Sequence, residues 1–225
     1  MKSKPSPHSK AVTTGDPKSP LLDGIERPET IIFEHLAVAI LVNRLFTEYG
    51  WDMVVVGGTA LGFYTHWNYA PTNLDLCRRQ HRPIPPNIQV AVMQRLGGIR
   101  LRGLHQWKVF GVIVNIHGVV ETDYRHCLRE AHSLGGRVQV IPVEQLLVER
   151  FRLATMPSVG AIETRSVNVA RQLLAACLDG TTVVDWAMAE AIAGSEAYGI
   201  LEPFRAWWES GGDSMPTAVA RPMSE

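Results

Sequence analysis

The sequence predicts an α/β (α+β) fold, in which a small mixed β-sheet with flanking helices is followed by a C-terminal helical bundle. Three observations lead to this prediction. The run VVVGGTALGFY at Val54–Tyr64 reads as a buried strand that turns at once into a helix. Short apolar runs alternate with helical periods up to about residue 142, and beyond that point the apolar spacing is helical.

Length and composition are those of a globular protein. The chain has 225 residues, of which 46% are hydrophobic, so it can bury one substantial core with a helical extension. Lys plus Arg equals Asp plus Glu at 22 each, so the overall charge favours no class of partner. Cys77, Cys127 and Cys177 form no CxxC pair, which argues against a disulfide framework and a thiolate zinc site. Without an apolar run of membrane-spanning length, we expect a cytoplasmic protein with no membrane partner.

Composition also divides the chain. Residues 1–27 are rich in Pro, Ser, Thr and Lys and cannot bury enough apolar surface to offset the entropy of ordering, so a disordered basic arm is expected. Residues 211–225 have the same character and are expected to form a disordered tail. Between them we place an α/β core at 28–142 and a C-terminal helical region at 143–210.

The first half of the chain alternates helices and strands. Apolar residues at helical spacing predict a helix over Glu29–Tyr49, which Gly50 closes. The same reasoning predicts a strand at Asp52–Val56, a helix at Thr59–Trp67 and a strand at Leu74–Cys77. After a proline-rich break come a helix at Asn87–Leu96 and strands at Ile99–Leu104 and Lys108–Ile116.

The second half is mainly helical. We expect a helix at Glu121–Ser133 and one more short strand at Arg137–Ile141. Further helices are expected from Pro142 to Thr155, at Ile162–Leu178, at Val183–Ala193, and around Phe204, Trp207 and Trp208.

A glycine-rich turn between a strand and a helix is typical of a phosphate-binding loop, because backbone N–H groups and the helix N-terminus face the ligand. A Walker A loop requires Lys-Ser/Thr after its last glycine, but Phe63-Tyr64 follows Gly62 here. A dinucleotide-binding turn requires GxGxxG, and Thr59 stands where the second glycine belongs. Since Asp75 could serve as its ribose-binding acid, dinucleotide binding stays open as a minor alternative.

A third interpretation covers more of the chain. The segments VVVGGTALGFYTHWNYAPTNLDLC, VFGVIVNIHG, VQVIPVEQLLVERFRLAT and RSVNVARQLLAACL resemble the nucleotidyltransferase (polymerase β-like) superfamily over roughly residues 29–180. The likeness is greatest to small bacterial AbiEii-like, minimal nucleotidyltransferases. It implies a nucleotidyltransferase-like sheet, an NTP ligand, Mg²⁺ as cofactor and transfer of a nucleoside monophosphate to a hydroxyl acceptor.

The resemblance assigns roles to individual residues. Gly57, Gly58 and Thr59 match the turn that holds the nucleotide phosphates, and Asp75 matches the second acid of the family's Asp-x-Asp motif, a metal ligand. The other two acid positions fall on Asn73 and Asn115. Taken singly, each Asn could instead be an ordinary turn or strand residue.

Two asparagines at acid positions weaken the expected chemistry. Magnesium prefers anionic oxygen ligands, and an amide cannot act as the base that takes the proton of the attacking hydroxyl. Two functions therefore remain open: a nucleotidyltransferase, or an inactive pseudoenzyme that binds nucleotide, nucleic acid or a protein through the same cleft. Glu121 or Asp123 could restore a carboxylate if the register slips.

A basic sector follows the Asp75 strand. Between Leu76 and Val120 there is no Asp or Glu, whereas seven Lys or Arg residues occur there: Arg78, Arg79, Arg82, Arg95, Arg100, Arg102 and Lys108. Arg78 and Arg79 are predicted to contact nucleotide phosphates. The whole sector could bind tRNA or another nucleic acid, or it could be a solvated face whose charges are balanced elsewhere. A protein acceptor is also possible.

Overall fold

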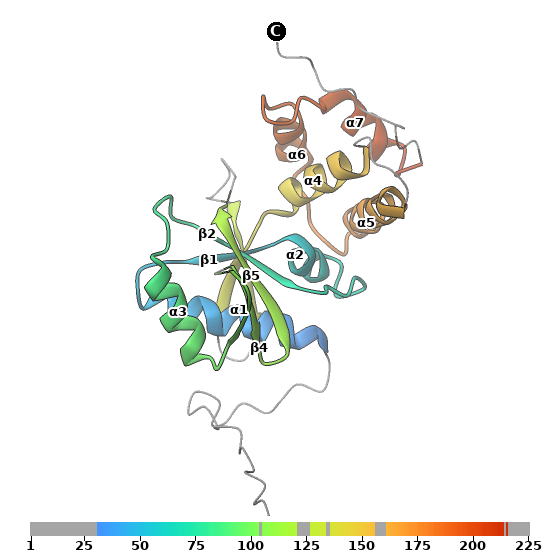
Figure 1. Ribbon diagram of the computed structural model, residues 1–225. Helices are drawn as coiled ribbons and strands as arrows, with labels where there is room; N and C mark the ends of the chain where they lie inside the picture. The colour runs from blue at the N-terminus through green and yellow to red at the C-terminus, as the bar shows by residue number, and fades with distance from the viewer. Residues whose placement is uncertain are drawn as a thin grey trace, which may run out of the picture.

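The computed structural model describes residues 31–103, 105–120, 127–133, 136–155, 161–213 and 215. Its described part contains a seven-stranded mixed sheet with flanking helices, which confirms the predicted fold class (Figure 1). The elements in chain order are α1 (Ile31–Thr47), β1 (Met53–Val56), α2 (Gly57–Tyr64), β2 (Leu74–Arg78), α3 (Pro86–Arg95), β3 (Ile99–Arg102), β4 (Gln106–Val109), β5 (Val112–Val119), β6 (Arg129–Ser133), β7 (Gly136–Val140), α4 (Val143–Thr155), α5 (Ala161–Leu178), α6 (Trp186–Ala193) and α7 (Leu201–Glu209).

The sheet places β1 and β2 near its centre, in the order β3-β4-β5-β2-β1-β7-β6. β1 is antiparallel to β2 and parallel to β7, and β2 is parallel to β5. Asp75 therefore lies opposite Val56 on one side and Asn115 on the other. This register brings the end of β1, where the glycine turn begins, next to two of the predicted site residues.

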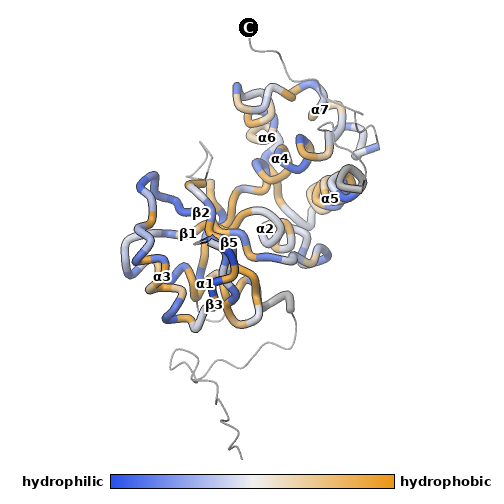
Figure 2. Tube along the Cα trace, in the orientation of Figure 1, coloured by the Kyte–Doolittle hydropathy of each residue, from blue (hydrophilic) through white to orange (hydrophobic). Residues whose placement is uncertain are grey.

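Helices α1 and α3 bury one side of the sheet. α1 contacts β1, β7 and β6 and also packs against α3. The inward side chains of β2 and β5, such as Leu74, Leu76, Val114 and Ile116, are almost fully buried. Figure 2 shows hydrophobic residues concentrated in the central strands, whereas the segment between β2 and α3 is hydrophilic. Because strand side chains alternate, Asp75 and Asn115 belong to the opposite face of the sheet.

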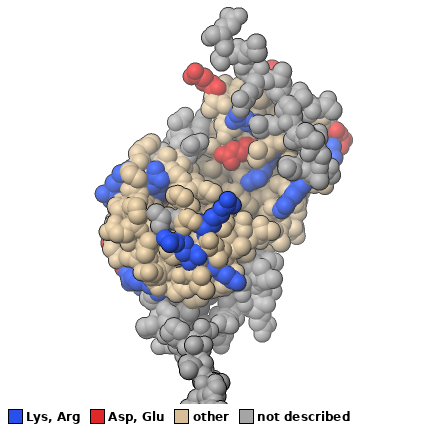
Figure 3. All heavy atoms as spheres, viewed as in Figure 1, with Lys and Arg blue, Asp and Glu red and all other residues tan. Residues whose placement is uncertain are grey.

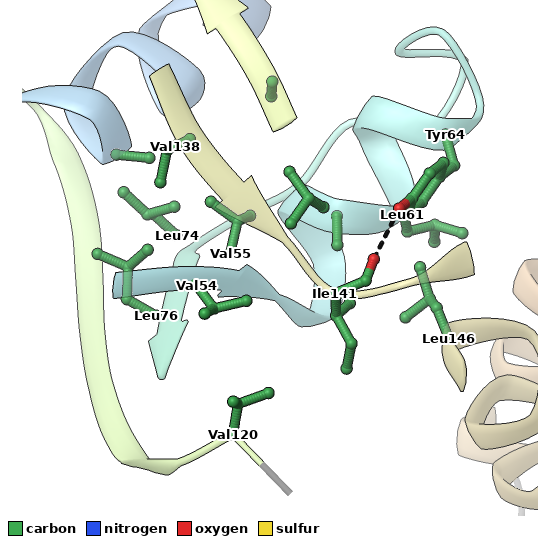
Figure 4. Close-up of a cluster of buried hydrophobic side chains, with 14 of the residues drawn as sticks. Val54, Val55, Leu61, Tyr64, Leu74, Leu76, Val120, Val138, Ile141 and Leu146 are labelled. Atoms are coloured by element: carbon green, nitrogen blue, oxygen red, sulfur yellow. Dashed lines mark hydrogen bonds between the residues drawn. The ribbon is translucent and has the colours of Figure 1, made fainter. Parts of the chain in front are cut away.

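Helices α4, α5, α6 and α7 form a second body beside the sheet, and α2 lies between the two (Figure 1). A buried hydrogen bond ties α2 to the strand end that leads into α4: Tyr64 Oη donates to Ile141 O at 2.7 Å (Figure 4). Thr182 Oγ1 donates to Tyr64 O at 2.5 Å. These contacts tie α2 to the segments that lead into α4 and out of α5.

Two predicted elements are wrong. The predicted helix over Glu121–Ser133 is a strand in its last part, because Arg129–Ser133 pair with β7 at the edge of the sheet. Residues 121–126, including Glu121 and Asp123, lie outside the described residues. The predicted strand Lys108–Ile116 is two strands, because Phe110 and Gly111 take positive φ angles of 48° and 89° and make a hairpin turn.

The predicted arm at residues 1–27 and most of the predicted tail lie outside the described residues. Among the helices that the structure describes, none combines the length and apolar character needed to span a bilayer. Cys177 is buried, Cys77 and Cys127 are half-buried, and none of the three forms a disulfide.

Candidate functional site

The turn between β1 and α2 requires glycine at its first position. Gly57 has a φ of +62°, a conformation that side chains disfavour, and a Cβ there would lie 2.7 Å from Asp75 Oδ2. At Gly58 a Cβ would meet only ordinary contacts, the nearest being Tyr69 Cε1 at 3.5 Å. The Val56 N-cap of α2 provides no side-chain hydrogen bond. The first N–H groups of α2, which have no acceptor within the helix, therefore have no N-cap side chain to satisfy them.

Asp75 is the acid beside this turn, and its side chain is 25% exposed. Its Oδ1 accepts hydrogen bonds from Asn115 Nδ2 at 2.8 Å and from His117 Nε2 at 3.1 Å. Asn115 Oδ1 in turn accepts from Gln106 Nε2 at 3.1 Å. A polar network thus crosses β4, β5 and β2 and ends at the glycine turn.

The network sets the charge of Asp75. Burial alone raises the pKa of this carboxyl, but the hydrogen bonds from His117 and Asn115, together with the positive charges of His117 and Arg150, outweigh burial and hold its pKa below 3.8. The hydrogen bond to Asp75 raises the pKa of His117 above 6.5, against an opposing effect of burial. Asp75 is therefore ionised at neutral pH, and His117 is more readily protonated than an isolated histidine.

An open cavity of about 280 Å³ adjoins the turn and Asp75. One wall comes from the sheet side and consists of Gly57, Gly58, Tyr69, Thr72, Asn73 and Asp75. The other wall comes from α4 and α5 and consists of Arg150, Leu153, Arg165, Ser166 and Val169. The charged groups of the described lining are thus two guanidinium groups and one carboxylate.

The structure brings some predicted site residues together and separates others. Gly57, Gly58, Asn73 and Asp75 line the cavity, and Asn115 contacts Asp75. Thr59 does not line it: its side chain is buried, and its Oγ1 donates to Asn73 O at 3.0 Å. Thr59 therefore fixes the turn instead of presenting its hydroxyl to a ligand.

Arg78 and Arg79 also lie away from the cavity. In the pairing of β1 with β2, Arg78 lies opposite Met53, which is at the other end of β1 from the glycine turn. Arg79 lines a separate cavity of about 410 Å³, together with Asp52 and Arg137. The structure thus does not support phosphate contacts by these two arginines in the cavity that contains Asp75.

Three titratable residues of the described site were not predicted as site residues: His117, Arg150 and Arg165. His117 could have been found, because it stands two residues after Asn115 and so shares its face of the strand. Arg150 and Arg165 reach the cavity only because α4 and α5 pack beside α2. Both lie in segments that resemble the nucleotidyltransferase superfamily, but the resemblance assigned neither of them a role in the site.

The donor set does not fit the magnesium site that the resemblance implies. Asp75 can only accept hydrogen bonds when ionised, so Asn115 must turn its NH₂ toward it and its oxygen toward Gln106. Mg²⁺ requires oxygen ligands, and the amide N–H group at this acid position cannot coordinate it. Oδ1 of Asp75 accepts from Asn115 and His117, so a metal would be left with Oδ2 of this one carboxylate and no second carboxylate in the described lining.

Comparison with solved structures gives several partial matches, and the three that follow have TM-scores below 0.5. A nucleotidyltransferase-like antigenic protein from Paracoccidioides brasiliensis is 16% identical, with a TM-score of 0.49, and the match covers 61% of this chain and 73% of that one. That protein is nucleotidyltransferase-like by name. ANT(2″)-Ia, whose structure contains adenylyl-2″-tobramycin, is 16% identical with a TM-score of 0.48 over 77% of this chain and 96% of its own. The Megavirus polyadenylate synthase is 16% identical with a TM-score of 0.40 over 68% of this chain and 33% of its own.

These likenesses concern the arrangement of helices and strands and assign no role to any residue. No protein-family model matches the chain, and no curated protein matches it.

The basic sector is spread over several surfaces. Arg95 Nη1 pairs with Glu48 Oε2 at 2.6 Å, and the Arg82 guanidinium lies 4.3 Å from the Trp51 ring centroid. Arg100, Arg102 and Lys108 are exposed on β3 and β4. Figure 3 shows Lys and Arg side chains gathered on the visible face of the body that holds the sheet.

Proposed function

We propose that this chain is a nucleotide-binding protein with a nucleotidyltransferase-like fold, and that the cavity beside Gly57 holds the phosphates of its ligand. One observation carries the proposal. The first N–H groups of α2, which receive no hydrogen bond acceptor from an N-cap side chain, lie beside a cavity whose opposite wall contains Arg150 and Arg165. Backbone N–H groups at a helix start and guanidinium groups both favour a phosphate.

The size of the cavity indicates how much of a nucleotide it encloses. At about 280 Å³ its volume lies just below the range of about 300–1,000 Å³ that is typical of ligand pockets. The cavity therefore suits the phosphate chain, and the remainder of the nucleotide extends from its open side. Tyr69 and Leu153 supply apolar surface within the lining, and Leu153 is 46% exposed.

Binding without rapid transfer is the better supported role. Nucleotidyl transfer with two metals needs several carboxylates, whereas the described lining contains Asp75 alone. Asp75 still lies against the glycine turn, as transfer would require, so slow transfer is the second candidate function. The resemblance to the AbiEii-like subset remains a prediction.

The dinucleotide-binding alternative loses its structural basis. That fold needs the glycine turn to open a parallel βαβ unit, but β1 is antiparallel to β2, the next strand in the chain. Nucleic acid remains a proposed partner, supported by the exposed Arg100, Arg102 and Lys108.

The test is calorimetric titration of the full chain with ATP, GTP, CTP and UTP in the presence of Mg²⁺, beside the Gly58→Ala variant. A Cβ at Gly58 meets only ordinary contacts, so this variant should fold while its methyl group narrows the cradle. We expect binding of at least one nucleotide by the parent and weaker binding by the variant. If no nucleotide binds the parent, the proposed function is wrong. Release of pyrophosphate in the same mixtures would instead favour the transferase.

A further inference from the structure

Phosphates in this cavity need a source of positive charge. In the family that the sequence resembles, carboxylates hold metal ions, and the metal ions neutralise the triphosphate. Here Asp75 is the only carboxylate of the described lining, and its Oδ1 already accepts hydrogen bonds from Asn115 and His117. A divalent cation would therefore have few ligands here. Oδ1 of the one carboxylate already accepts two hydrogen bonds, and the acid position at Asn115 presents an amide N–H group.

The opposite wall carries the compensating charge. Arg150 comes from α4 and Arg165 from α5, two helices that pack against each other. With Asp75, these groups give the described lining a net charge of +1, from two guanidinium groups and one carboxylate. An anion is therefore favoured in the cavity before any metal is added.

Arg150 lines the cavity, and part of its hydrogen-bonding capacity is unused by the described residues. Its Nε atom is buried and has no hydrogen-bond partner among the described residues. Leaving a buried donor unsatisfied is costly, and a shift of the side chain toward the cavity would let an anion there accept this hydrogen bond. The Arg150 charge also reaches the Asp75 side of the cavity, since it contributes to the lowered pKa of Asp75.

We propose that this cavity binds the polyphosphate chain of its ligand without a divalent metal ion, with Arg150 and Arg165 in the place of the metal. The inference rests on the proposed function, because it describes how the same cavity holds its nucleotide. The ligand class is a polyphosphate ester or a free polyphosphate, since both present the same chain of anionic oxygens to a guanidinium group.

The test repeats the titration in EDTA and in Mg²⁺, with ATP, tripolyphosphate and adenosine as separate ligands. The proteins are the parent, Arg150→Ala, Arg165→Ala, the charge-retaining Arg150→Lys and the matched control Arg152→Ala. Arg152 lies on the same helix two residues away, 5.4 Å from the Tyr198 ring centroid, and is not among the residues that line the cavity. Circular dichroism checks that each variant is folded.

We expect the parent to bind ATP in EDTA at least as tightly as in Mg²⁺, and to bind adenosine far more weakly. Loss of a charged hydrogen bond should weaken ATP binding by about tenfold to a hundredfold in Arg150→Ala, and Arg165→Ala should weaken it less because Arg165 is exposed. Arg150→Lys should retain part of the affinity, and Arg152→Ala should bind like the parent.

Each contrary result has a separate meaning. ATP binding that requires Mg²⁺, or an Arg150→Ala variant that binds like the parent, overturns this inference and leaves the proposed function intact. An equal loss in Arg152→Ala also overturns it, because the effect would then be one of overall charge. Tripolyphosphate that binds as tightly as ATP supports the inference but assigns the cavity to free polyphosphate. The absence of any binding, with or without metal, contradicts the proposed function itself.

Discussion

Asn115 and Asp75 lie opposite each other on the parallel strands β5 and β2, and the amide nitrogen of Asn115 donates a 2.8 Å hydrogen bond to Asp75 Oδ1. Two carboxylates at these positions would repel each other unless a cation lay between them. The amide removes that repulsion, so Asp75 can remain ionised without a metal. Asn115 and Asp75 thus stabilise each other through a hydrogen bond, whereas two carboxylates at these positions would need a bound cation.

The first prediction reverses this relationship. The double variant Asn73→Asp/Asn115→Asp gathers carboxylates around Asp75, so we expect it to be less stable than the parent in EDTA and to recover stability when Mg²⁺ is added. Thermal unfolding with and without Mg²⁺ measures this. Asn168→Asp, an exposed change on α5 outside the cavity lining, is the charge control and should show no such recovery. A Mg²⁺ response in the double variant no larger than that of the control would contradict the assignment of the acid positions.

The second prediction concerns pH. The pKa of His117 is raised above 6.5 by Asp75, so the ion pair contributes its full stability below pH 6.5 and loses it as the pH rises through the folded-state value. The pKa of Asp75 is lowered below 3.8, so its contribution is present above that pH and is lost as the pH falls through the folded-state value. The pair therefore stabilises the fold most between these two limits.

Replacing His117 with Gln keeps a hydrogen-bond donor and removes the titrating charge. We expect the difference in unfolding free energy between the parent and His117→Gln to be larger near pH 6 than above the folded-state pKa of His117. Urea unfolding at a series of pH values measures this difference. In NMR titrations, Asp75→Asn should return the His117 pKa toward 6.5. A His117 pKa that does not change in Asp75→Asn would show that the two side chains do not interact.

The third prediction separates two costs at the glycine turn. Gly57→Ala places a side chain at positive φ, which costs about 1–2 kcal/mol, and also places Cβ 2.7 Å from Asp75 Oδ2. Gly97 has a similar φ of +66°, and a Cβ added there would have no atom within 4 Å, so Gly97→Ala has the backbone cost alone. Urea unfolding should show that Gly57→Ala is the less stable of the two. Equal stability would mean that Asp75 moves away freely, and the close approach would then have no energetic importance.

Local sequence was sufficient to predict the glycine turn and its acid. The run of valines before Gly57 and the position of Asp75 on the next strand are short-range patterns, and the register between β1 and β2 then brings them together. Arg150 and Arg165 are different, because they join the site only through the packing of α4 and α5 beside α2, and helical periodicity does not reveal which helix packs where.

The strand β6 shows another limit of local patterns. In Arg129–Ser133 only Ala131 is buried, so the alternation that marks a half-buried strand is too short to be recognised. Pairing with β7 makes this segment a strand. Arg78 and Arg79 show that closeness in sequence does not place residues in one cavity. Three or four residues along an extended strand span about 10 Å or more, so these two arginines lie near the other end of β1 from Asp75.

The last prediction tests how α2 is held beside the helical body. Tyr64 Oη donates to Ile141 O at 2.7 Å in a buried environment, and burial, followed by the negative charge of Glu144, raises the pKa of this hydroxyl. Tyr64→Phe keeps the ring and removes the donor, which leaves the Ile141 carbonyl without this bond and should cost about 1–3 kcal/mol. Tyr49→Phe is the control, because Tyr49 is 39% exposed and its loss of a hydroxyl should have little effect. If urea unfolding shows equal stability for both variants, the hydrogen bond between Tyr64 and Ile141 does not hold α2 in place, and apolar packing together with the Thr182 hydrogen bond to Tyr64 O must position the cavity wall.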